Sequence, residues 1–214
     1  TGLPSVTFNA TAAGPAAIVV AAAGNNQVAV QGTAVGTLPA VRVTDALGNS
    51  VGGVAVTFAV ASGGGLVTGA SQVTDASGIA TVGGWTLGAA APNTLTATVT
   101  GGGITGNPVT FTAQSVTTIS LTTVPAGPLT LGTNFVITVR LRDAAAAAAP
   151  LAGVSLNIVI ASGGGTLGGT LTAVTDPTGI ATFTVNVTGA AGARTFTISG
   201  PGLTSATTAA ITFN

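Results

Sequence analysis

The sequence predicts an all-β fold built from two tandem β-sandwich domains. Three blocks of sequence recur in the same order, each about 100 residues from its copy, which indicates an internal structural repeat. Within the blocks, apolar residues alternate with small or polar ones, as in half-buried strands. The chain has 214 residues, of which 46% are hydrophobic. That length accommodates two domains of about 100 residues, each able to bury a core.

The repeated blocks set the expected domain boundaries. The matched blocks are residues 40–45 and 138–143, residues 53–65 and 153–165, and residues 73–81 and 174–182. Three matches in the same order cannot plausibly arise by chance, so both copies are expected to share one fold. We therefore divide the chain into an N-terminal segment (1–13), a first repeat (14–114) and a second repeat (115–214).

Each repeat is predicted to consist of short strands. Clusters of Gly, Asn, Pro and Ser separate about seven strands per repeat, which is the spacing of an immunoglobulin-like sandwich. Phe111 and Phe213 are expected on the strands that close the two sandwiches, at equivalent positions. The alternating residues expected in the two cores are Val54, Val56, Phe58 and Val60, or their offset neighbours, in the first copy, and Leu156, Ile158 and Ile160 in the second.

The composition excludes several classes of function. Lys and Arg together number 4, Asp and Glu together number 4, and there is no His or Cys. Without His and Cys the chain has no thiol nucleophile, no Ser-His-Asp triad and no zinc or haem ligands. Four cations cannot supply the basic surface that nucleic-acid binding needs, and no apolar run approaches the ~20 residues of a membrane-spanning helix. We predict a non-enzymatic protein with no cofactor, no metal, no nucleic-acid partner and no transmembrane segment.

Three aspartates precede a glycine by three positions. One interpretation is a calcium site, but Ca²⁺ takes six or more oxygen ligands and each motif supplies one carboxylate. The other is a turn, in which the carboxylate accepts hydrogen bonds from backbone N–H groups and the glycine adopts a positive φ. We predict structural turns at all three: Asp45 with Gly48, Asp75 with Gly78, and Asp176 with Gly179.

The repeated blocks resemble the bacterial immunoglobulin-like domains of the invasin and intimin type, often called group 1. The resemblance lies in residues 42–54, the strand up to Phe58, and residues 74–80, with matches at Asp143 and residues 150–154 and 175–181 in the second repeat. It implies β-sandwiches that serve as spacer, stalk or fibre modules on the bacterial cell surface, and no enzyme. The chain departs from typical members in being only 4% charged and lacking Lys.

The N-terminal segment is expected to contain one strand more than the two repeats need. Val6-Thr-Phe8 resembles residues 109–111 and 211–213, which end the two repeats. Two interpretations remain open. The chain is a slice of a longer tandem array, or the segment is a donor strand whose Val6 and Phe8 fill pockets of a neighbouring subunit by β-strand addition. Subunits joined head to tail in this way form open filaments.

The net charge of zero and the mean hydropathy of +0.73 favour association, because near-neutral, apolar surfaces are poorly soluble. We predict a structural subunit of an extracellular filament or surface fibre, assembled head to tail as a homopolymer with the N-terminal strand paired to a neighbour. Its expected partners are other copies of itself and, as a second class, other cell-surface components. The alternative is a spacer or stalk segment of a bacterial adhesin or surface protein. S-layer-like and carbohydrate-binding modules are lesser alternatives, the latter disfavoured by a single Trp and no Tyr.

Overall fold

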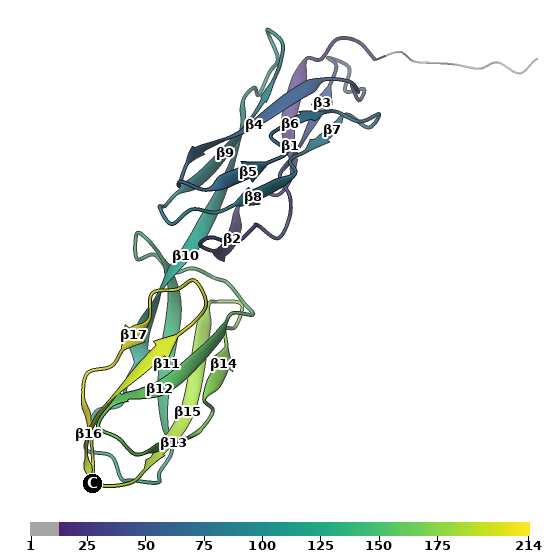
Figure 1. Cartoon of the computed structure of the whole chain (residues 1–214). Helices are drawn as coiled ribbons and strands as arrows, with labels where there is room; N and C mark the ends of the chain where they lie inside the picture. The colour runs from purple at the N-terminus through teal and green to yellow at the C-terminus, as the bar shows by residue number, and fades with distance from the viewer. Residues whose placement is uncertain (1–12) are drawn as a thin grey trace, which may run out of the picture.

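The computed structural model describes residues 13–214, and this part of the chain is built of strands β1 to β18 with no helix. Two hydrophobic cores follow one another along the chain: the first lies between Val19 and Ala113, and the second between Val116 and Phe213. Figure 1 shows the two sandwiches end to end, with β10 running from one into the other. The predicted all-β, immunoglobulin-like sandwich fold is confirmed. The predicted boundary at residues 114 and 115 falls inside β10.

The first sandwich has two main sheets. Its first sheet has the order β1 (Ile18–Ala23), β3 (Ala40–Thr44) and β7 (Ile79–Thr81). The facing sheet has the order β6 (Ser71–Val73), β4 (Ala55–Ser62), β9 (Asn93–Val99) and β10 (Val109–Thr123), with β2 (Gln27–Val30) parallel to β10. Two further strands, β5 (Leu66–Thr68) and β8 (Gly84–Thr86), pair with each other.

The second sandwich repeats this arrangement. One sheet has the order β13 (Thr166–Gly169), β15 (Ile180–Thr188), β11 (Phe135–Asp143) and then β10. The other has the order β14 (Thr172–Val174), β12 (Ser155–Ser162) and β16 (Gly192–Ser199). Both β17 (Ala206–Thr207) and β18 (Ile211–Phe213) pair with β16.

The cores follow the alternation that the sequence displays. Val56 and Phe58 of β4 are buried, while Val54 and Val60 are half-buried and pack against the first core. In β12, Leu156 and Ile158 are buried and Ile160 lies at the margin of the second core. The neighbours of these side chains in β4 and β12 face outward, as the period of two in a strand requires.

A single strand connects the two sandwiches, and no linker separates them. Residues 109–113 of β10 pair with β9, and residues 116–123 pair with β11. Strand β2 runs alongside the crossover, in parallel register with residues 113–116. Val28 of β2 packs against the second core, although it belongs to the first sandwich. The Gln31 side chain reaches across the junction and its Nε2 donates to the carbonyl of Gly202 at 2.7 Å. Strand β2 and the residue that follows it therefore brace the junction beside β10.

The closing strands of the two sandwiches are not equivalent, and the predicted correspondence of Phe111 with Phe213 is wrong. Phe111 lies opposite Leu95, whereas Phe213 lies opposite Gly192. In the second sandwich the closing strand is interrupted between β17 and β18. Thr208 is buried at this interruption, where its N–H donates to the carbonyl of Phe196 and its Oγ1 accepts from the N–H of Phe196. Both phenylalanines are nevertheless fully buried.

The two closing phenylalanines should each be essential to their own core. Phe111→Ala and Phe213→Ala are each expected to lower the free energy of unfolding by about 3–5 kcal/mol, because each removes a buried aromatic ring and leaves a cavity. Urea unfolding measures the change. Thr110→Ala, at an exposed position of the same strand, is the control and should change stability by less than about 0.5 kcal/mol. A neutral Phe→Ala variant would contradict the assigned core.

Candidate functional site

The described residues contain no group of three or more His, Cys, Asp or Glu side chains that could hold a metal ion. Between residues 13 and 214 no helix has the length and apolar character needed to cross a membrane. The candidate features for a site in residues 13–214 are the four aspartates, the buried Arg194 and the groove at the junction of the two sandwiches.

Asp75 and Asp176 hold matching turns. Oδ1 of Asp75 accepts hydrogen bonds from the backbone N–H and the hydroxyl of Ser77 and from the N–H of Ile79. Oδ1 of Asp176 accepts the same three bonds from Thr178 and Ile180.

The glycines of these two turns, Gly78 and Gly179, have φ values of 75° and 76°. A Cβ on Gly78 would lie 2.5 Å from the carbonyl oxygen of Val43, and one on Gly179 would lie 2.2 Å from that of Ala149. Both conformation and space therefore require glycine at these positions.

Asp45 and Asp143 hold a second pair of turns, one at the N-terminal end of each sandwich. Oδ1 of Asp45 accepts from the N–H groups of Leu47 and Asn49. Oδ1 of Asp143 accepts from the N–H groups of Ala145 and Ala147.

The second oxygen of each of these carboxylates anchors the chain as it approaches the sandwich. Oδ2 of Asp45 accepts from the N–H of Gly14 at 2.9 Å. Oδ2 of Asp143 accepts from Nε2 of Gln114, also at 2.9 Å. The aspartates are thus used twice, once to shape a turn and once to fix the incoming segment.

Hydrogen bonding sets the acidity of these carboxyl groups. The side chain of Asn49 and the backbone N–H of Gly14 lower the pKa of Asp45 from 3.8 to about 2. Burial alone would raise the pKa of Asp143, but hydrogen bonds from Gln114 and from the N–H of Ala147 outweigh it and leave that pKa below its ordinary value. Bonds from Ser77 and Ile79 lower the pKa of Asp75.

In Asp176 the N–H of Ile180 and the hydroxyl of Thr178 have the same effect, and the positive charge of Arg140 adds to the lowering of its pKa. All four described aspartates are therefore carboxylates that act as hydrogen-bond acceptors, and none has the raised pKa of a general acid.

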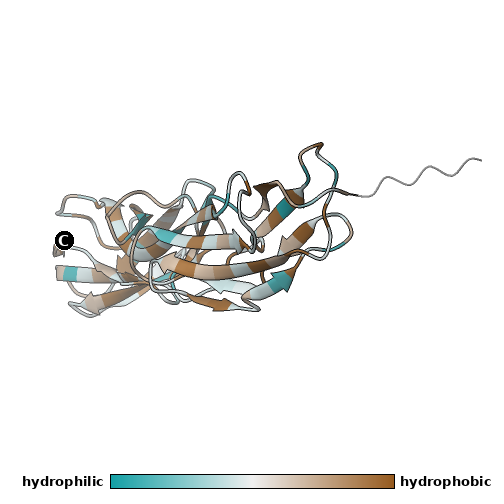
Figure 2. Cartoon of the chain, turned by 90° about the horizontal axis from the view of Figure 1, so that it is seen from above, coloured by the Kyte–Doolittle hydropathy of each residue, from teal (hydrophilic) through white to brown (hydrophobic). Residues whose placement is uncertain are grey.

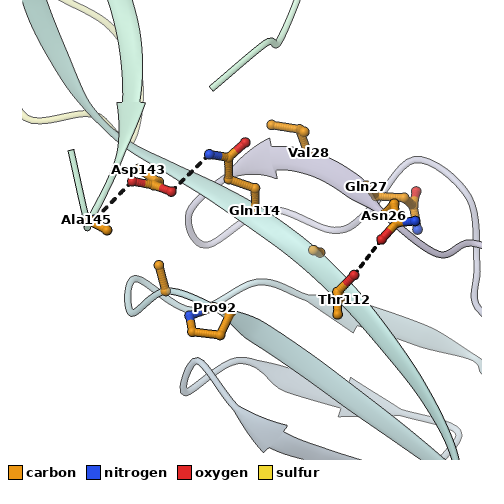
Figure 3. A pocket seen from close by; sticks show the side chains of 10 residues that line it. Asn26, Gln27, Val28, Pro92, Thr112, Gln114, Asp143 and Ala145 are labelled. Carbon is orange, nitrogen blue, oxygen red and sulfur yellow. Dashed lines mark hydrogen bonds between the residues drawn. The ribbon is translucent and has the colours of Figure 1, made fainter. Parts of the chain in front are cut away.

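A groove of about 500 Å³ lies beside the junction (Figure 3). Its polar side chains mostly bond within the protein: Oγ1 of Thr112 donates to Oδ1 of Asn26, and Gln114 bridges Asp143 and the carbonyl of Ala148. Pro92, from the loop that precedes β9, lies across the groove from Ala145 of the Asp143 turn. The groove is lined by Asn26, Gln27, Val28, Ala91, Pro92, Thr112, Ala113, Gln114, Asp143 and Ala145.

Sequence reasoning missed the structural role of Arg194. This side chain is only 2% exposed, and its guanidinium donates to the carbonyls of Gly164, Ala190 and Gly192. Its charge lies 5.3 Å from the ring centroid of Phe213. Asn93 has the matching place in the first sandwich, where it bonds Gly88 and Ala90. The signal in the sequence was a polar residue at an inward position of an alternating strand.

No family model matches the chain, and no curated protein matches it. Among solved structures, the Yersinia pseudotuberculosis adhesin InvE is 19% identical with a TM-score of 0.41, and the match covers 92% of this chain and 58% of that one. The Escherichia coli adhesin FdeC is 18% identical with a TM-score of 0.46, covering 92% and 62%.

The D0–D1 domain of intimin is 19% identical with a TM-score of 0.37, covering 92% and 98%. A β-glycosidase from Bacteroides vulgatus also matches, at 14% identity and a TM-score of 0.36, over 24% of its length. The chain spans less than two thirds of the InvE and FdeC structures. Likenesses this distant concern the fold alone and assign no function to this chain.

Stability should be lost in acid and constant near neutrality. Because the folded state lowers the pKa of each described aspartate, the unfolded chain binds more protons between pH 4 and 2, and the stability that these groups contribute above pH ~4 falls as the pH falls through the folded pKa values. Urea midpoints at pH 2, 3, 4, 5, 7 and 9 should drop below pH 4 and stay flat above pH 5. Asp45→Asn should weaken the drop, and a steep change between pH 5 and 8 would contradict the assignment.

Arg194→Met keeps much of the apolar stem and removes the guanidinium. The expected loss is about 2–4 kcal/mol of unfolding free energy, because buried carbonyls that received hydrogen bonds from a charged group are left without donors. Arg42→Met is the matched control, because Arg42 is exposed and donates to the hydroxyl of Ser50. Equal urea midpoints for Arg194→Met and the native chain would show that the buried cation is dispensable.

Proposed function

We propose that this chain is a rigid structural unit of an extracellular filament or surface fibre, in which subunits join head to tail. The observation that carries the proposal is the strand β10, which closes the first sandwich and opens the second without a linker. A hydrogen-bonded strand resists bending far better than the Gly- or Ser-rich linkers that let domains move freely. A rigid unit of this kind would transmit force along a filament and hold the subunits on either side of it at a fixed distance.

The surface of the protein also supports assembly. Figure 2 colours the ribbon by hydropathy and shows apolar and weakly polar residues along both sandwiches, with hydrophilic residues scattered among them. With a net charge of zero, a surface that exposes large apolar side chains favours association over solubility. The exposed large apolar side chains are Val20, Leu38, Leu47, Leu66, Val73, Val136, Val159, Leu171 and Val174.

In the filament, residues around Val6 and Phe8 add as a strand to a neighbouring subunit. These two residues lie outside the described part of the chain. What supports a receiving site is the closing strand of the second sandwich, which consists of a two-residue β17 and a three-residue β18.

A spacer or stalk segment of a bacterial adhesin or surface protein is the second candidate. The hydrogen bond from Gly14 to Asp45 favours it, because the chain approaches the first sandwich much as it approaches the second at Gln114 and Asp143. A long array of such sandwiches in one chain would produce this repetition without any contact between subunits. A location on the cell surface or outside the cell is common to both candidates.

Electron microscopy of the purified chain separates the two candidates. The filament proposal expects fibres with a regular axial repeat, whereas isolated short rods at every concentration would support the stalk instead.

Deleting residues 1–10 should leave two folded sandwiches, checked by circular dichroism, that no longer polymerise. Phe8→Asp should have the same effect and Thr7→Asp, on the opposite face of the strand, should not. Identical fibres after the deletion would exclude the donor strand.

A further inference from the structure

The junction inside the chain shows how two sandwiches of this kind fit end to end. Two surfaces are involved. The N-terminal pole of a sandwich comprises the aspartate turn and the glycine-rich loop before the closing strand: residues 45–49 and 101–105 in the first sandwich, and 143–147 and 200–204 in the second. The C-terminal pole comprises the segment that runs parallel to the closing strand, which is β2 in the first sandwich, and the residues that lead into β9 or β16. These are residues 26–31 and 88–92 in the first sandwich, and residues 127–131 and 189–193 in the second, where 192 and 193 already belong to β16.

We propose that the N-terminal pole of the first sandwich docks on the C-terminal pole of the second sandwich in another copy of this chain, with Leu47 at the centre of the contact. The proposal rests on the filament form of the proposed function and names its interface. The internal junction indicates which surface covers the N-terminal pole of the first sandwich. The second sandwich has an equivalent N-terminal pole, and the C-terminal pole of the first sandwich covers it.

The two N-terminal poles share the same backbone contacts. In the first sandwich Thr105 donates to the carbonyl of Ala17, and Val19 donates back to the carbonyl of Thr105. In the second, Thr204 donates to the carbonyl of Thr117, and Ile119 donates back to Thr204. With the aspartate turns also matched, the two poles present the same framework to whatever lies beyond them.

The two C-terminal poles are matched as well. The N–H of Gln31 donates to the carbonyl of Val116, and the N–H of Leu131 donates to that of Asn214. The next residues correspond in the same way. The N–H of Gly32 donates to the carbonyl of Leu87, and the N–H of Gly132 donates to the carbonyl of Val187, both at 2.8 Å. Exposed Pro128 of the second sandwich has the place of Val28, which packs against the neighbouring core at the internal junction.

Leu47 is 88% exposed, the most exposed of the large apolar side chains in residues 13–214. It follows Asp45 by two positions, as Ala145 follows Asp143, and Ala145 lines the groove of the internal junction opposite Pro92. Inside the chain, the small Ala145 lies near the larger Pro92. Between two copies the large residue is Leu47 and the small one is Ala193, which precedes buried Arg194 and has the position of Pro92. The larger Leu47 would thus meet a smaller residue and occupy the space that stays open as a groove inside the chain.

The contact requires little desolvation of charge. Asp45 is 3% exposed and Arg194 is 2% exposed, and both are already hydrogen-bonded within their own sandwiches. Burying such satisfied groups further avoids the penalty that free charges would bring to an interface. Apolar burial of Leu47 and Pro128 then contributes directly to association.

The test is a charge placed at the pole. Leu47→Asp should raise the critical concentration for fibre formation by about tenfold or more, measured by pelleting and electron microscopy, because a buried unpaired carboxylate opposes docking. The matched control is Leu171→Asp, at an exposed side position, which should assemble as the native chain does. Adding Ala193→Arg to Leu47→Asp should restore assembly by pairing the charges across the contact.

The outcomes are distinguishable. Native assembly by Leu47→Asp, with the donor-strand deletion still inactive, would overturn the pole contact and leave the proposed filament standing. Loss of assembly without rescue by Ala193→Arg would overturn the placement of Leu47 against residues 189–193. A native chain that forms no fibres and no end-to-end dimers in sedimentation would refute the filament and the contact together.

Discussion

Strand β10 is the element on which the rest of the structure depends. Its first part supplies Phe111 to one core, and its second part supplies Val116 and Ile119 to the other. Because one continuous backbone serves both sheets, the register in one sandwich fixes where the next begins. Val28 and Gln31 of the first sandwich can therefore be placed against the second, and bending at the junction would break contacts in both. The connection between the sandwiches is thus made by the fold itself, without a linker between them.

The scarcity of charge is compatible with folding because other groups take over its usual roles. Cross-strand hydroxyl pairs lie on the outer faces, between Thr122 and Thr138 and between Thr197 and Thr207, both at 2.8 Å. Such pairs stabilise neighbouring strands without attracting counter-ions. The aspartates accept several backbone N–H groups each, and Arg194 donates to several carbonyls.

The repeat and the alternation of apolar residues were sufficient to predict the sandwich fold, because both depend on local pattern. The correspondence of Phe111 with Phe213 failed, because an interruption after Thr207 shifts the register of the closing strand, and a short motif such as Thr-Phe does not encode its partner. Arg194 was missed for a related reason. Arg194 stabilises the second sandwich by donating to carbonyls in the loops around Gly164 and Ala190. The sequence alone does not show that these loops lie beside it. Contacts within one turn, as at Asp75, can be predicted from the sequence, whereas contacts between loops that are distant in the sequence cannot.

The aspartate turns show how the two sandwiches keep one framework and present different surfaces. Gly48 has a φ of 85°, and the residue at its place in the second sandwich, Ala146, keeps a φ of 62°. A left-handed alanine costs roughly 1–2 kcal/mol, so the hydrogen bonds to Asp143, and not the choice of glycine, maintain this turn. Since the carboxylate dictates the backbone, the side chains on the turn are free to differ. The second sandwich has small alanines there, beside a sandwich already in place, whereas the first displays Leu47 to the solvent. The fold does not require a leucine in one turn and alanines in the other. We attribute this difference in side chains to the different surfaces that the two poles contact.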